Sequence, residues 1–223
     1  MGNFDSDGGS ENQWEDRGEL AWNEFDWERY LREQDESVER YLGFYQAARL
    51  DPERIDHVAE KMQWGEDDWS DDPETDDDDD DTADGPGEDV YTLHKNPIFI
   101  ATKAIYLGLN RAWETLAVDS GKVPTRLAVQ FLLSLQRGEE FAVQAIHALD
   151  FGDYAMAVSL FKRALGALNQ SLALLNAEAT AADPALVGWR EDAFAAFFDL
   201  REVWLRVITE CREEFDRTGE DED

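Results

Sequence analysis

The chain has 223 residues, of which 52 are acidic and 20 are basic, so its formal net charge is −32. Such a charge repels nucleic-acid phosphates and anionic lipid headgroups, so we expect no direct nucleic-acid binding and no membrane association. The single cysteine, Cys211, excludes an intrachain disulfide and favours a reducing, cytoplasmic compartment. The acidic first residues also lack the basic and apolar regions of a secretory signal.

The negative charge is divided unevenly along the chain. Residues 1–90, which we call the acidic arm, contain 32 acidic and 7 basic residues, whereas residues 91–223 contain 20 and 13. Adaptation to high salt would distribute carboxylates over the whole surface, so this concentration favours an interaction segment instead. A segment of this charge would select a basic protein surface as its partner.

The acidic arm is predicted to contain a disordered start and a helical hairpin. Residues 1–19 are polar and acidic, so we expect disorder there. Apolar residues at intervals of three and four from Trp27 onward predict an amphipathic helix. Asp51 and Pro52 then supply the N-cap and the first-turn proline of a shorter second helix. The apolar stripe of this hairpin, residues 20–64, is too small for an independent core, so the hairpin either docks on the remaining chain or awaits a partner.

The rest of the chain is predicted to be a linker followed by a helical domain. Residues 65–94 combine six consecutive aspartates with proline and glycine, which is typical of a disordered acidic linker. Residues 95–217 contain four segments of helical periodicity, and residues 218–223 form an acidic tail. The connections of about four to six residues favour antiparallel neighbours. The expected fold is therefore all-α: an up-down antiparallel four-helix bundle preceded by the short helical hairpin and the acidic disordered linker.

Within this bundle, the apolar stripes predict which large side chains are buried. Trp113, Phe161 and Trp204 each lie on the apolar stripe of a different helix, so we expect all three to be buried and close to one another in the core. Asp183 and Pro184 start the last helix, which we expect to reach about Phe215. A helix of about 32 residues is about 48 Å long, so its end should overhang the other helices.

No group of residues predicts a catalytic, cofactor or metal site. His57, His94 and His147 lie in different segments, and the Glu-x-x-His pairs of di-iron bundles do not occur. Phosphate-binding loops and nucleophile motifs are also missing from the sequence. We therefore expect no catalytic residue, no cofactor and no metal, and the sequence favours a non-enzymatic protein without excluding an enzyme.

Large aromatic residues among the acids of the arm are the strongest signal for binding. Disordered acidic tails usually lack tryptophan, whereas aromatic anchors with acidic neighbours suit the binding of a basic protein. We predict a protein-interaction or adaptor protein whose helical scaffold carries this arm. For Trp22 and Trp27, packing against the protein's own bundle is an equal alternative. The predicted partner-binding residues are Trp22, Trp27, Trp64, Trp69, Asp76, Asp77, Asp78, Asp79, Asp80 and Asp81.

A helical-bundle enzyme or small-ligand carrier is the alternative interpretation. Its site would lie among polar side chains at the bundle centre, where Lys103, Asn110, Arg111 and Glu114 are the best candidates. A pocket with convergent polar groups there would support the carrier, whereas a filled apolar core would support the adaptor. A third hypothesis, an arm that shields its own bundle, is compatible with both. The sequence leaves the oligomeric state open.

Overall fold

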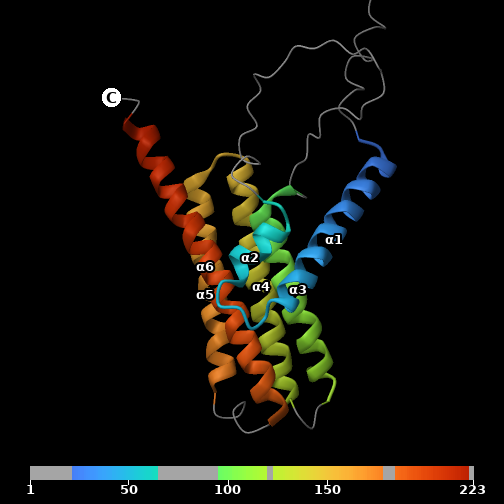
Figure 1. Ribbon diagram of the computed structural model, residues 1–223. Coiled ribbons are helices and arrows are strands. Elements are labelled where there is room, and N and C mark those ends of the chain that lie inside the picture. Colours follow the sequence, from blue (N-terminus) through green and yellow to red (C-terminus); the bar gives the residue numbers. More distant parts are fainter. Residues whose placement is uncertain (1–21, 65–94, 120–122, 178–183, 221–223) are drawn as a thin grey trace, which may run out of the picture.

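The computed structural model describes residues 22–64, 95–119, 123–177 and 184–220. These residues form six helices, which confirms the predicted all-α class (Figure 1). The helices are α1 (Glu24–Ala47), α2 (Arg54–Lys61), α3 (Pro97–Ala117), α4 (Thr125–Asp150), α5 (Tyr154–Asn176) and α6 (Pro184–Glu220). The predicted disordered start, residues 1–19, and the predicted linker, residues 65–94, lie outside the described residues.

Side-chain caps determine where several helices begin. The Asn23 carboxamide oxygen accepts a hydrogen bond from the Phe25 N–H at 2.8 Å, and the Asp26 carboxylate accepts one from the Asn23 N–H at 3.1 Å. This reciprocal arrangement is a capping box, and it starts α1. Asn96 caps α3 and Asp153 caps α5 by a simpler arrangement, in which each side chain accepts a hydrogen bond from a backbone N–H of the first turn.

The start of α2 differs from the prediction. Asp51 and Pro52 are not its first residues, because α2 begins at Arg54. The Asp51 carboxylate instead accepts the Glu53 N–H at 3.0 Å and lies 2.5 Å from Nδ1 of His57. These contacts fold residues 51–53 into a turn. Asp51, the predicted N-cap, therefore stabilises the turn that precedes α2.

Helices α3, α4, α5 and α6 pack side by side, and we call them the helical core. Helix α4 contacts α3 and α5, α6 contacts α5 and α3, and successive helices run in opposite directions (Figure 1). Buried small residues are frequent on α4 and α5, which allows the two helices to approach closely. Gly138 on α4 is required by Tyr106 on α3, because a Cβ at Gly138 would lie 2.4 Å from the Tyr106 hydroxyl.

The interior of the helical core is filled by large aromatic side chains. Trp113, Phe161 and Trp204 are all buried, as predicted. The predicted closeness holds for Phe161 and Trp204, whose rings lie 6.2 Å apart, whereas Trp113 packs on Phe131 at 4.5 Å instead. The Trp204 indole N–H donates to the Thr102 hydroxyl at 3.2 Å, so its polar group is satisfied in the core.

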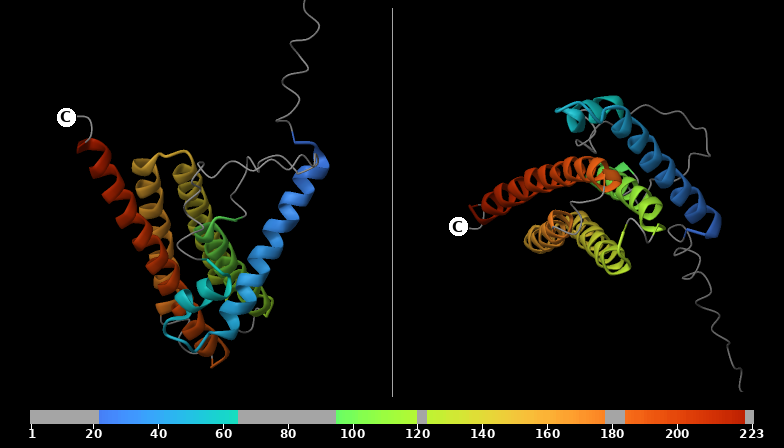
Figure 2. Two further views of the ribbon diagram at one scale, coloured as in Figure 1. Left: turned by 45° about the horizontal axis from the view of Figure 1, so that its top comes forward. Right: turned by 90° about the horizontal axis from the view of Figure 1, so that it is seen from below.

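The hairpin of α1 and α2 docks on the helical core, which resolves the alternatives that the sequence left open. Helix α1 packs along α3, and the two helices come close at Gly108, where an added Cβ would lie 3.0 Å from Leu42 Cδ1. The N-terminal half of α1 then diverges from the core (Figure 2). The C-terminal end of α6 also projects beyond the other helices, as expected from its length (Figure 1).

Candidate functional site

One apolar stripe runs along α1 and changes its surroundings halfway. In the C-terminal half, Val38, Leu42 and Tyr45 are buried and belong to the hydrophobic core. In the N-terminal half the same stripe continues through Leu31 and Trp27, which are 48% and 38% exposed. This second half lies where α1 leaves the helical core (Figure 2). This part of the stripe therefore remains exposed outside the hydrophobic core.

Aromatic rings gather at the start of α1. The ring centroids of Trp22 and Trp27 lie 4.9 Å apart, and that of Tyr30 lies 5.4 Å from Trp22. The structure thus brings together Trp22 and Trp27, two of the predicted partner-binding residues. Their contacts are edge-to-face, which is a favourable aromatic geometry and holds the cluster in a defined shape.

The charges around the exposed half of α1 are mainly negative. Residues 24–36 include six acidic residues and two arginines. Both arginines, Arg29 and Arg32, pair with an acid of α1 itself. Glu24 and Asp35 are exposed and take part in no ion pair within the described ranges. This half of α1 therefore combines apolar and aromatic area with unmatched carboxylates.

Trp64 lies at the other end of the hairpin and is packed against α1. Gln63, two residues after the end of α2, has a positive φ of 63°, and the Trp64 N–H donates back to the Ala59 carbonyl at 3.0 Å. This is the geometry of a Schellman motif, which commonly ends helices. It places the Trp64 ring on Tyr41, with centroids 5.5 Å apart. Trp64 thus joins α2 to α1, whereas Trp69 and Asp76–Asp81 lie outside the described residues.

Charged side chains fasten the hairpin to α6. Three residues at seven-residue intervals on α6 each pair with a hairpin residue of opposite charge. The pairs are Asp192 with Arg49, Asp199 with Arg54, and Arg206 with Asp56. In the central pair the side chains of Arg54 and Asp199 are only 10% and 14% exposed. Exposed ion pairs contribute about 0–1 kcal/mol, so the central pair is the important one.

The central pair belongs to a buried hydrogen-bond network. Asp199 accepts hydrogen bonds from both the Arg54 guanidinium and the Tyr45 hydroxyl. Arg54 also donates to the Arg49 carbonyl at 3.0 Å, and its guanidinium lies 5.0 Å from the centre of the Tyr45 ring. Burial, reinforced by the Asp199 charge, raises the pKa of Tyr45, so its hydroxyl remains a donor. This network fixes the end of α1 on α6.

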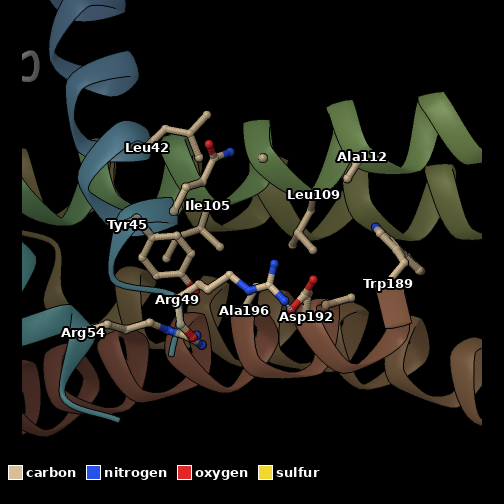
Figure 3. Close-up of a pocket in the computed structure, with 13 residues that line it drawn as sticks. Leu42, Tyr45, Arg49, Arg54, Ile105, Leu109, Ala112, Trp189, Asp192 and Ala196 are labelled. Atoms are coloured by element: carbon tan, nitrogen blue, oxygen red, sulfur yellow. Dashed lines mark hydrogen bonds and ion pairs between the residues drawn. The ribbon is translucent and has the colours of Figure 1, made fainter. Parts of the chain in front are cut away.

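A groove lies next to this network, where the end of α1 meets α3 and α6 (Figure 3). Its volume is about 360 Å³. Tyr45 and Trp189 stand at its opposite ends, with Arg49 and Asp192 between them (Figure 3). The floor is apolar and comes from both core helices. It consists of Ile105, Gly108, Leu109, Ala112, Ala193 and Ala196.

The four polar residues proposed for a carrier site do not converge. The Lys103 ammonium lies 2.5 Å from a carboxylate of α4, whereas Arg111 pairs with a carboxylate of α1. Glu114 is exposed, and Asn110 is half-buried. These residues therefore face different neighbours, and the groove described above is lined by residues for which the sequence gave no signal.

Comparison of the chain with protein-family models, with curated proteins and with solved structures gave no match. Each helix in the described ranges is too short or too polar to cross a lipid bilayer. Within the same ranges, no three histidine, cysteine or acidic side chains come together as a metal site requires. The exposed half of α1 and the groove are thus the two features on which function can be argued.

Proposed function

We propose that the protein is a non-enzymatic adaptor whose acidic, aromatic arm binds a basic protein partner. In this proposal, α3 to α6 form an up-down antiparallel four-helix bundle that serves as the scaffold. Residues 65–94 form an acidic disordered linker between the hairpin and the scaffold. The exposed half of the α1 stripe is the observation that carries the proposal.

This part of α1 offers apolar area that the helical core does not cover. Leu31 and Trp27 are spaced by four residues on one helix face, which is the spacing that an opposing amphipathic helix contacts. Fully burying a large apolar side chain contributes about 1.5–3 kcal/mol, and Leu31 and Trp27, which are 48% and 38% exposed, can each still contribute roughly half of this amount or less. Trp22 packs against Trp27 at the same end of the helix, and the buried Tyr30 supports both rings.

The charge of this surface selects the partner. Glu24 and Asp35 take part in no ion pair in the described ranges, so lysine or arginine side chains of a partner would match them. The most suitable partner is a basic amphipathic helix. We further propose that Trp69 and Asp76–Asp81 assist it, the tryptophan as an anchor and the aspartates by attracting the partner over longer distances.

The test uses a fluorescent amphipathic helical peptide of leucine and lysine, with a scrambled peptide of the same composition as its control. Binding to the full chain is followed by fluorescence anisotropy. We expect the amphipathic peptide to bind more tightly than the scrambled one. Changing both Trp27 and Leu31 to alanine should weaken binding about tenfold or more, mainly by raising koff. Equal binding of the two peptides would contradict the proposal.

Charge variants separate attraction from anchoring. Changing Glu24→Gln and Asp35→Asn should lower kon and flatten the salt dependence of binding, because exposed charges act over a screened range. The matched control, Glu210→Gln with Glu213→Gln on α6, removes the same charge elsewhere and should change kon less. Identical effects of the two double variants would mean that only net charge attracts the peptide.

A further inference from the structure

We propose that the groove between the end of α1 and the core helices α3 and α6 binds a small molecule with an aromatic body and one carboxylate. This site is separate from the exposed half of α1 and does not depend on the adaptor function. The volume of the groove, its apolar floor and its unused hydrogen-bond donors all favour such a ligand.

The size and floor of the groove suit an apolar ring system. Its volume of about 360 Å³ lies within the range of about 300–1,000 Å³ that is typical of small-molecule pockets. Gly108 and Ala112 lie one helical turn apart on α3, and Ala193 and Ala196 of α6 line the same groove. Because all four residues are small, the space between the two helices is left unfilled.

Two fixed aromatic rings bound this space. Trp189 packs against Trp113 at 4.9 Å and against Phe131 at 5.4 Å. At the other end, the Tyr45 hydroxyl is held by Asp199 of the buried network. Because both rings are held in position before any ligand binds, an aromatic ligand placed between them loses little free energy in ordering the site.

Hydrogen-bond donors predominate among the unused polar groups of the groove. Arg49 contacts Asp192 through one nitrogen, Nη2, at 3.3 Å, and its side chain is 62% exposed. A guanidinium carries five N–H donors, so most of them remain available. The Gln46 amide and the Trp189 indole N–H make no hydrogen bond within the described part of the chain.

These donors specify the polar group of the ligand. A planar carboxylate matches the fork of a guanidinium and can accept two parallel hydrogen bonds from it. The pair between Arg49 and Asp192 is exposed and therefore weak, so a ligand carboxylate can bind beside Asp192 or replace it. Arg54 cannot take this role, because its guanidinium is engaged by Asp199.

The test titrates the full-length protein with 1-naphthylacetate, and with 1-naphthylacetamide as the neutral probe of the same shape. The Trp189 indole N–H and the Gln46 side-chain amide are followed by ¹H–¹⁵N NMR, with Trp189→Phe used to assign the indole signal. We expect both signals to shift with naphthylacetate. The neutral probe should bind about tenfold more weakly, because it loses the charge-assisted contact.

Variants locate the site. Arg49→Gln should weaken the binding of naphthylacetate about tenfold and leave the affinity for naphthylacetamide unchanged. Ala112→Leu, which fills the floor, and Gln46→Trp, which covers the mouth from an exposed position, should each abolish the binding of both probes. Arg212→Gln, which removes an exposed arginine of α6 that does not line this groove, should affect neither probe.

Several results would overturn the proposal. One is the absence of any shift at Trp189 and Gln46 with millimolar naphthylacetate. Another is equal affinity for the acid and the amide, which would show that no donor recognises the carboxylate. Retained binding in both blocking variants, with thermal unfolding showing that they are folded, would place the probes elsewhere on the protein.

Discussion

The C-terminal and N-terminal halves of α1 carry the same stripe of apolar residues, yet the C-terminal half is buried against the helical core, whereas Trp27 and Leu31 of the N-terminal half are exposed. Val38 and Leu42 lie against the helical core, whereas Leu31 is about half exposed. The difference comes from the geometry of the contact with α3, because Leu42 packs closely on Gly108 whereas the N-terminal half of α1 diverges from the core (Figure 2). A helix that crosses its neighbour at an angle loses contact with it on both sides of the crossing. The apolar stripe therefore shows which face of α1 is suited to packing, but it does not show which part of that face packs against the helical core.

The two halves also differ in how their charges are used. At the docked end, Arg49, Arg54 and Asp56 pair with α6 and fasten the hairpin. At the projecting end, Arg29 and Arg32 pair with acids of α1 itself, and Glu24 and Asp35 take part in no ion pair in the described ranges. Charge thus stabilises an intramolecular contact at one end and is available for an intermolecular one at the other.

The largest expected effect is the release of the docked half by Asp199→Ala. The substitution removes the acceptor that Arg54 and Tyr45 share, and breaking a buried pair costs about 3–5 kcal/mol. We expect hydrogen-exchange protection to fall in α1 and α2 and to persist in α3 to α6. Asp192→Ala breaks an exposed pair on the same face of α6 and should cost less than about 1 kcal/mol. A hairpin that stays protected in Asp199→Ala would show that apolar contacts alone hold it.

A second test removes apolar contact from the docked half. Leu42→Ala should lower the free energy of unfolding by an amount near the lower end of the about 2–5 kcal/mol range for buried leucine. The low end is expected because Leu42 borders the groove, so its neighbours can relax into existing space. Chemical denaturation measures the change. An unchanged unfolding midpoint would mean that the crossing of α1 and α3 contributes nothing to stability.

A smaller effect should come from pH at the turn before α2. The hydrogen bond with Asp51, and then the Asp51 charge, raise the pKa of His57 above its ordinary value. The protonated form is thus the one that the folded state favours. Its stabilising contribution is complete below the unfolded pKa of about 6.5 and is lost as pH rises through the folded value.

Amide exchange of α2 measures this loss between about pH 5 and pH 8. Protection should fall with rising pH in the native chain and become less dependent on pH in His57→Gln. An NMR titration of the His57 ring that gave a pKa at or below the ordinary value would contradict the expected direction.

The smallest effect on stability is expected in the projecting half. Leu31→Ala should change the free energy of unfolding by less than about 0.5 kcal/mol, because the side chain is about half exposed and lies outside the core. The same substitution should weaken the binding of the amphipathic peptide. Denaturation and anisotropy on one sample separate the two effects. A destabilisation above about 1 kcal/mol would show that Leu31 already packs against another part of the chain.

Sequence reasoning was accurate where a short-range pattern carries the information. The three- and four-residue spacing predicted the apolar stripe of α1 and the burial of Trp113, Phe161 and Trp204. The Asp51 and Pro52 signal placed the start of α2 two residues too early, because Asp51 uses its carboxylate in a turn. The end of α2 gave no glycine signal, since Gln63 adopts the left-handed conformation there.

The sequence contains a charge pattern that could have predicted the docking of the hairpin. Asp192, Asp199 and Arg206 recur every seven residues on α6, which places them on one face of the helix. Such a charged stripe beside an apolar one indicates a second contact surface. The groove had no comparable signal, because its lining comes from three helices and its defining property is missing volume.

The sequence by itself determined the helices, their apolar faces and the uneven distribution of charge, because these properties depend on residues within a few turns of one another. The tertiary structure alone decided that α1 crosses α3 at Gly108, that Asp199 holds Arg54 and Tyr45, and that a groove remains beside them. Those outcomes depend on how side chains distant in the sequence fill a shared space, and local periodicity contains no information about that fit.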